Sequence, residues 1–216
     1  MKKISKGWWA VIIIALILII DQTIKIWVKT SFWLGEDMQI LPWFHLRFIQ
    51  NNGMAFGMEF GPKLYLTIFR IVIVGILIWY LTRLVRNRRT PMGYIVVICM
   101  ITAGAAGNIF DCMFYGLIFN NPGYGEVAHF VPFGEGYAGF LQGLVVDMFY
   151  FPLFSFEWPT WMPFVGGKTF SFFDPVFNFA DASICVGIFF LLVRYYRYLG
   201  GDTLRSQISS EPTAQK

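Results

Sequence analysis

Long apolar runs separated by polar segments are the main pattern of the chain. Four runs carry few charged residues, and they span residues 8–28, 64–81, 93–114 and 176–199. An α-helix rises about 1.5 Å per residue, so about 20 apolar residues cross a hydrocarbon core about 30 Å thick. We therefore predict an all-α membrane protein with four transmembrane helices. The runs form one polytopic domain, residues 1–200, and we expect the polar tail, residues 201–216, to be disordered.

The segments between the first and second runs and between the third and fourth runs have a different pattern. Residues 44–57, FHLRFIQNNGMAFG, alternate in part and then reach Asn-Asn-Gly, which predicts a short strand and a turn. Segment 115–175 is rich in Gly and aromatic residues. Its pieces GLVVDMFYF and KTFSFF are typical of strands or of a helix lying on the membrane surface. We expect a small region of extended chain and surface helix on the outer face.

The basic residues lie at the ends of the apolar runs. They gather in residues 2–6, 83–89 and 194–205, whereas segment 115–175 holds one Lys and no Arg. The positive-inside rule then places both termini in the cytoplasm and segments 29–63 and 115–175 outside. With 56% hydrophobic and only 14% charged residues, the chain could not cover a soluble domain of this length. Its basic residues sit at the ends of apolar runs and are not concentrated on one soluble face, which argues against a nucleic-acid partner.

Ionisable and amide side chains interrupt the apolar runs, and each needs a partner or a task because lipid does not solvate it. At about 1.5 Å per residue, all of them fall toward the outer ends of the helices. They are Asp21, Lys25, Arg70, Asn108, Asp111, Asn178 and Asp181, with Asp147 in the outer segment. The sequence thus predicts one polar layer near the outer membrane face.

Several of these residues are spaced so that they share a helix face. The pairs three or four residues apart are Asn108 with Asp111, Asn178 with Asp181, and Asp21 with Lys25. The structural interpretation is an ion pair inside the first helix and amide hydrogen bonds between helices.

Asp147 and Asp181 also allow a chemical interpretation. Two carboxyl groups held close together cannot both ionise, so one keeps a proton while the other acts as a base. The base activates a water molecule, and the acid protonates the scissile carbonyl or the leaving amine. The sequence has no HExxH motif, no G-x-S-x-G motif and only two His, so it offers no set of residues for zinc or for a serine nucleophile.

Five motifs occur in an order that resembles the lipoprotein signal peptidases (signal peptidase II). They are DQTIKIWVK (21–29), NNGMAFG (51–57), GAAGNIFD (104–111), VVDMF (145–149) and FNFADASICVG (177–187). Each motif alone is weak, but their order on the predicted topology extends the resemblance over about residues 8–199.

The resemblance implies an aspartic endopeptidase of the bacterial cytoplasmic membrane. Such enzymes remove the signal peptide from a diacylglyceryl-modified prolipoprotein just before the lipidated cysteine. It implies Asp147 and Asp181 as the catalytic dyad. The residues implied to shape the site, bind substrate or support the structure are Asn51, Gly53, Asn108, Asp111, Asn178, Ala180, Asp21 and Lys25. It further implies no metal or organic cofactor, a monomer among membrane lipids, and inhibition by globomycin-type cyclic peptides.

Two features depart from the family pattern. Cys112 stands where the family usually has Arg, and we hypothesise that Arg70 supplies this charge by pairing with Asp111, since both lie near the same membrane depth. The chain between Asp111 and Asp147 is longer than in the family, which makes Asp111 the alternative second member of the dyad. The Gly and aromatic content of residues 117–143 suggests a mobile flap over the acyl chains of the substrate.

Two other classes of protein stay open on these residues. One is a small transporter or channel whose intramembrane Asp and Lys carry ions. The other is a non-catalytic assembly factor whose polar residues only pack helices. Transporters hold such groups near the midplane and often contain internal repeats. Here the groups gather near one face and no repeat is visible. Cleavage of a lipidated prolipoprotein would separate the classes.

Overall fold

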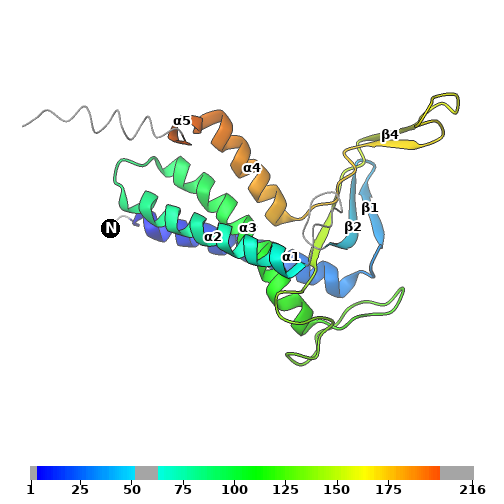
Figure 1. The fold of residues 1–216 in the computed structure, drawn as a ribbon, viewed down its shortest axis with the longest axis horizontal. Helices are drawn as coiled ribbons and strands as arrows, with labels where there is room; N and C mark the ends of the chain where they lie inside the picture. Colours follow the sequence, from blue (N-terminus) through cyan, green and yellow to red (C-terminus); the bar gives the residue numbers. More distant parts are fainter. Residues whose placement is uncertain (1–3, 52–62, 200–216) are drawn as a thin grey trace, which may run out of the picture.

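The structure, a computed structural model, describes residues 4–51 and 63–199. Its long helices lie side by side in a bundle, and its strands gather at one end of that bundle (Figure 1). Gly53 and the tail 201–216 lie outside the described residues, so the predictions made for them stay predictions.

Within residues 4–51 and 63–199, three helices are long and apolar enough to cross a membrane. They are α1 (Lys6–Ser31), α2 (Lys63–Arg86) and α3 (Met92–Ile118). Each contains the apolar run from which it was predicted and extends past both ends of it. The chain is therefore a multi-pass membrane protein, with most of the large side chains of α1 and α2 exposed to the surroundings of the bundle.

The fourth predicted span is shorter in the structure than in the sequence. Helix α4 covers Phe179–Arg194, 16 residues, and α5 adds a single turn, Tyr196–Leu199. Helix α4 begins late because Asn178 is its N-cap: the Asn178 side chain accepts a hydrogen bond from the backbone N–H of Asp181. The prediction that Asn178 and Asp181 share a face inside a helix is thus wrong for Asn178, which lies just before the first turn.

Helix α3 is the centre of the bundle and packs against α1, α2 and α4. Two glycines allow α4 to approach it closely. A Cβ at Gly104 would run into the carbonyl oxygen of Ala180, and a Cβ at Gly107 would lie 2.7 Å from an Asp21 carboxylate oxygen. These contacts bring the start of α4 and the C-terminal half of α1 against the same face of α3.

A three-stranded antiparallel sheet, in the order β1-β2-β3, caps this end of the bundle. Its strands are β1 (Asp37–Leu41), β2 (Phe44–Asn51) and β3 (Val145–Tyr150). Strand β3 lies opposite β2 with Ile49 facing Asp147. The strand predicted within residues 44–57 and the strand in GLVVDMFYF are both confirmed.

The second hairpin pairs β4 (Phe154–Glu157) with β5 (Thr169–Phe172), which lies within KTFSFF. No helix occurs in residues 119–175, all of which are described, so the expected surface helix is wrong. In β4 (FSFE) and β5 (TFSF) apolar and polar residues alternate at a period of two, which matches a strand and gives a helix no apolar face.

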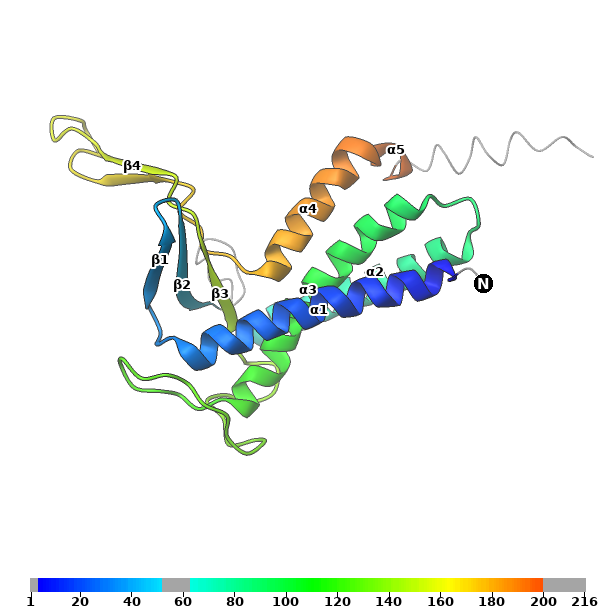
Figure 2. The same cartoon turned by 180° about the vertical axis from the view of Figure 1, so that it is seen from behind.

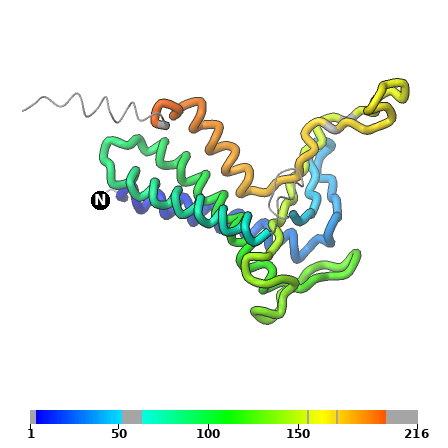
Figure 3. Tube along the Cα trace, in the orientation of Figure 1, coloured from blue at the N-terminus to red at the C-terminus, as the bar shows by residue number. Residues whose placement is uncertain are grey.

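Residues 119–144 form a long loop that folds back on the last turn of α3. The backbone N–H of Val131 donates to the Ile118 carbonyl at 2.9 Å, and that of Tyr137 donates to the Phe119 carbonyl at 2.9 Å. The loop leaves the bundle on one side of the sheet, and the β4–β5 hairpin leaves it on the other (Figure 3). The base of the loop 119–144 is hydrogen-bonded to the end of α3, while its residues Tyr124 and Phe133 are exposed.

The basic segments share the opposite end of the molecule, where the start of α1, the α2–α3 loop and α5 lie (Figure 2). The Lys6 Nζ donates to the carbonyl oxygens of Arg88 at 2.8 Å and Thr90 at 2.6 Å. Tyr94 of α3 stacks on Tyr198 of α5 at 4.9 Å between ring centroids. The bundle thus has one basic end and one end that carries the sheet.

Candidate active site

Two aspartates predicted as a dyad come from different elements at the sheet end. Asp147 lies in the middle of β3 and is buried, and Asp181 lies in the first turn of α4. The pairing of β2 with β3 sets the position of Asp147, and the N-cap of α4 sets the position of Asp181.

Two asparagines connect these carboxyl groups. The Asn178 Nδ2 donates to Asp147 Oδ1 at 2.6 Å and to Asn108 Oδ1 at 3.2 Å. The Asn108 Nδ2 in turn donates to Asp181 Oδ1 at 2.7 Å. The two carboxyl groups are therefore held in one network of amides, and the expected hydrogen bond between helices through Asn108 and Asn178 is confirmed.

Asp147 is the more enclosed of the two aspartates. Asn51, at the end of β2, donates an amide N–H to its Oδ2. Burial, together with the negative charge of nearby Asp181, raises the pKa of Asp147 to about 8. At neutral pH this carboxyl group keeps its proton, which is the condition for it to act as an acid.

Lys25 is the cation of the site and is fully buried. Its Nζ lies 3.0 Å from Asp21 Oδ2 and 2.8 Å from Asp111 Oδ2, and it donates to Asn108 Oδ1 at 2.8 Å. The predicted ion pair within the first helix is confirmed, and Asp111 adds a second acid. Through Asn108 the same ammonium orients the amide that binds Asp181.

Both carboxylate oxygens of Asp111 also accept hydrogen bonds from neighbouring elements. The Gln22 Nε2 donates to its Oδ1 at 2.8 Å, and the backbone N–H of Val146 donates to its Oδ2 at 3.3 Å. The second contact ties α3 to the strand that carries Asp147. With Lys25 also bound, Asp111 has the surroundings of a positioning group.

Arg70 does not pair with Asp111, so the hypothesised replacement of the missing arginine is wrong for this contact. Lys25 takes that place on Asp111 at 2.8 Å. The buried Nη1 of Arg70 has no hydrogen-bond partner among the residues that the structure describes. The error came from depth alone: two residues at the same level of a bundle can lie on helix faces that do not meet.

Ala180 acts through its backbone and its small size. Its N–H donates to Asp21 Oδ1 at 2.9 Å, which fixes the first turn of α4 to α1. Gly53, the remaining predicted residue, lies outside the described residues.

Sequence reasoning missed Gln22 and Lys29. Gln22 binds Asp111 and accepts a hydrogen bond from the Tyr115 hydroxyl at 3.0 Å. The buried Lys29 ammonium lies 5.1 Å from the ring centroids of Phe119 and Tyr137. Lys29 follows Lys25 by four residues, and this spacing could have shown that the polar stripe continues along one face of α1.

The part of the chain that the structure describes contains no set of side chains arranged to bind a metal ion. No group of three His, Cys, Asp or Glu side chains there is placed to hold an ion. The polar centre instead consists of carboxyl, amide and ammonium groups that hydrogen-bond to one another.

The fold and this centre define a class: a helical membrane protein that gathers buried carboxyl and amide groups at one end of its bundle. Two solved structures, both described as bacterial membrane enzymes studied by the in meso method, share the fold. One covers 100% of this chain and 99% of its own at a TM-score of 0.60 and 20% identity. The other covers 89% and 96% at a TM-score of 0.58 and 22% identity.

Sequence comparison identifies the family. The model of signal peptidase (SPase) II matches residues 13–197. A lipoprotein signal peptidase of Porphyromonas gingivalis is 47% identical over 100% of this chain and 98% of its own length. Another, of Amoebophilus asiaticus, is 35% identical over 85% and 76%. The chain belongs to the signal peptidase II family, a family of proteases, as the order of the five motifs had indicated.

Proposed function

We propose that this protein is an aspartic endopeptidase that removes the signal peptide from diacylglyceryl-modified prolipoproteins, just before the lipidated cysteine. The observation that carries the proposal is the amide network that joins Asp147 to Asp181 through Asn178 and Asn108. The names of the relatives, lipoprotein signal peptidases, supply the substrate class.

In this mechanism Asp147 starts protonated and Asp181 starts as the carboxylate. Asp181 takes a proton from a water molecule, whose oxygen attacks the scissile carbonyl carbon, while Asp147 gives its proton to the carbonyl oxygen. Collapse of the tetrahedral intermediate breaks the C–N bond, and the leaving amine takes the proton held by Asp181. The intermediate's second hydroxyl proton returns to Asp147, so the dyad ends as it began. The raised pKa of Asp147, about 8, supports its part as the acid at neutral pH.

The same proposal includes the membrane arrangement. Helix α4 with α5 would make the fourth crossing, both termini would lie in the cytoplasm, and the sheet would lie at the outer face of a bacterial inner membrane. The meeting of the basic segments at one end of the bundle supports this orientation, since basic residues concentrate on the cytoplasmic side.

A cleavage assay tests the function. With a lipidated prolipoprotein as substrate, Asp147→Asn and Asp181→Asn should each lower the rate about 100-fold or more, because each removes one half of the acid–base pair. Asp174→Asn is the matched control: Asp174 is exposed and accepts a hydrogen bond from the Tyr150 hydroxyl at 3.2 Å. It should cleave like the wild type.

Retention of most of the activity by either dyad variant would overturn the aspartic mechanism. A wild-type protein that folds in detergent and cleaves no lipidated prolipoprotein would overturn the function itself and favour a transporter or an assembly factor.

A further inference from the structure

Two adjoining hollows lie between α1 and α2 at the basic end of the bundle, far along the helices from Asp147. The first has a volume of about 550 Å³ and an apolar lining that includes Trp8, Val11, Ile78 and Leu81. The second has a volume of about 470 Å³ and is lined by Lys6, Arg86 and Arg88, among others. Ser5, Gly7 and Val85 line both, so the two hollows adjoin each other.

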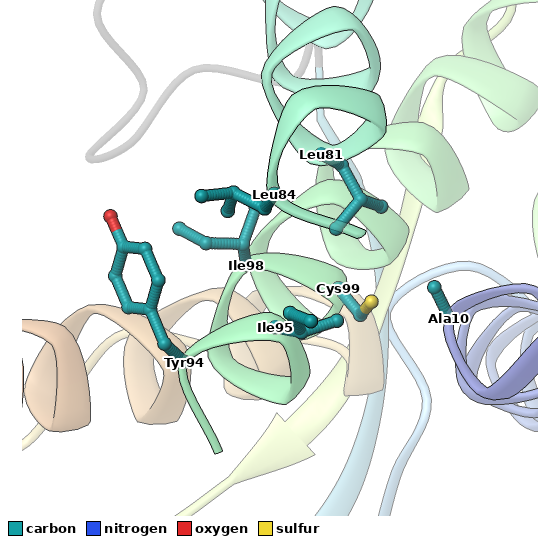
Figure 4. Close-up of a cluster of buried hydrophobic side chains, with 7 residues drawn as sticks. All are labelled: Ala10, Leu81, Leu84, Tyr94, Ile95, Ile98 and Cys99. Atoms are coloured by element: carbon teal, nitrogen blue, oxygen red, sulfur yellow. The ribbon is translucent and has the colours of Figure 1, made fainter. Parts of the chain in front are cut away.

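The apolar hollow is a groove with a solid floor. Ala10 and Leu81 are buried at its base, and Ile95 and Cys99 of α3 complete the same packed cluster (Figure 4). Trp8 and Val11 stand exposed at its edge. From Gly7 to Ile14 the groove follows α1 for about 10 Å, at 1.5 Å per residue.

The mouth of the groove is positively charged. The Lys6 Nζ is occupied by three carbonyl oxygens of the α2–α3 loop, those of Asn87, Arg88 and Thr90. These bonds fix the loop to the start of α1 and bring Arg86 and Arg88 to the second hollow. The guanidinium groups, and not the ammonium, are left to bind an anion.

Among the residues that the structure describes, none near this end is acidic. Residues 1–20, 60–110 and 182–201, which include all of α2 and the parts of α1 and α4 nearest this end, contain no Asp or Glu. A ligand that fits both hollows must therefore combine an anionic group with a flexible apolar chain.

We propose that this site binds one anionic phospholipid, with its phosphate between Arg86 and Arg88 and the upper part of an acyl chain in the groove. Basic pockets between transmembrane helices at the cytoplasmic side bind anionic headgroups in this way. The lipid joins α1 to α2 at the end opposite the active site. The inference is independent of the proteolytic mechanism.

Native mass spectrometry of the full chain in detergent micelles tests the proposal. Phosphatidylglycerol should be retained at least about tenfold more tightly than phosphatidylcholine with the same acyl chains. The double variant R86A/R88A should lose this preference. The double variant R194A/R197A removes two positive charges from the same end but outside the hollows, and it should keep the preference.

A second variant separates the groove from the headgroup site. A Cβ at Gly7 meets nothing closer than the Ser5 Oγ at 3.8 Å, and Gly7 lines both hollows, so we expect the ring of Gly7→Phe to occupy the space where they adjoin. It should weaken retention of phosphatidylglycerol about tenfold. In the wild type, inorganic phosphate at millimolar concentration should fail to displace the lipid.

Each contrary outcome would overturn the proposal. Equal retention of the two lipids, or equal losses in both double variants, would show that lipid binding depends on the general positive charge of this end and not on a specific site. Displacement by phosphate alone, or unchanged binding in Gly7→Phe, would remove the groove from the account. Cleavage of prolipoprotein should stay unchanged in all these variants, and this serves as the check that they fold.

Discussion

Two buried lysines on one face of α1 show how different the surroundings of like residues can be. Lys25 is held by Asp21 and Asp111 at 3.0 and 2.8 Å, whereas Lys29, one turn further on, has the rings of Phe119 and Tyr137 at 5.1 Å. The first ammonium compensates the negative charge of two contacting carboxylates, and the second lies against aromatic rings.

These surroundings predict that the same substitution affects stability strongly at Lys25 and weakly at Lys29. Lys25→Met leaves two buried carboxylates uncompensated and should cost about 3–5 kcal/mol, lowering the Tm in detergent by about 10 °C. Lys29→Met keeps the apolar contacts with the rings and should change the Tm by about 3 °C at most. Thermal unfolding followed by intrinsic fluorescence measures both. Equal losses in the two variants would contradict the role given to Lys25.

At this scale the sequence identified most of the site residues but not their connections. An ionisable residue within an apolar run is visible without a structure because lipid makes it costly. The role of Asn178 as a cap depends on where α4 begins. Whether Arg70 can reach Asp111 depends on which helix faces meet. Neither can be read from spacing alone.

Among the elements, α3 and α4 depend on close approach at two glycines. A Cβ at Gly104 would meet the Ala180 carbonyl oxygen and lie 2.7 Å from Ile184 Cγ1, whereas a Cβ at Gly75 in α2 has nothing within 4 Å. The first turn of α4 carries Asp181, so the spacing of these helices also sets the position of Asp181.

Paired glycine substitutions test this dependence. Gly104→Ala should destabilise the protein by about 1–3 kcal/mol and lower cleavage, because α4 has to move away from Asn108. Gly75→Ala, the same change in an exposed part of a helix, should stabilise it by up to about 1 kcal/mol and leave cleavage unchanged. Denaturation and cleavage assays on both variants give the answer. A Gly104→Ala protein as stable and active as the wild type would contradict the packing argument.

The elements themselves could be predicted unequally. Helices α1, α2 and α3 followed from runs of apolar residues, since each run is a local signal. The pairing of β2 with β3 joins Ile49 to Asp147 across a separation of 98 residues, and no local pattern in either strand names its partner. Local sequence likewise does not decide between strand and surface helix in segment 115–175.

The whole molecule has a basic end, an apolar bundle and an end that carries the sheet, from which two aromatic arms extend. One arm is the loop 119–144, which carries Tyr124 and Phe133, and the other is the β4–β5 hairpin, with Trp161 and Phe164 near its tip (Figure 3). The hypothesised flap corresponds to the first arm. Its base is hydrogen-bonded to the end of α3, so only its outer part is free to contact acyl chains.

Replacing the exposed aromatic residues of the first arm tests the flap. The double variant Tyr124→Ser with Phe133→Ser should raise the KM for a lipidated prolipoprotein about tenfold, equivalent to about 1.4 kcal/mol of lost apolar contact, with kcat little changed. Trp161→Ser with Phe164→Ser removes a similar exposed surface from the other arm and should leave the KM nearly unchanged. Equal increases from both arms would indicate general adsorption to the membrane and not contact with substrate.

The central claim is that Asp147 holds one proton while Asp181 acts as the base, and the pH dependence of prolipoprotein cleavage tests it most directly. The pKa of Asp147 lies at about 8. Above that pH the acid is lost, so the rate should fall about tenfold for each further pH unit. Asp174→Asn should give the same profile. A rate that stays level or keeps rising well above pH 8 would contradict an acid–base pair made of these two carboxyl groups.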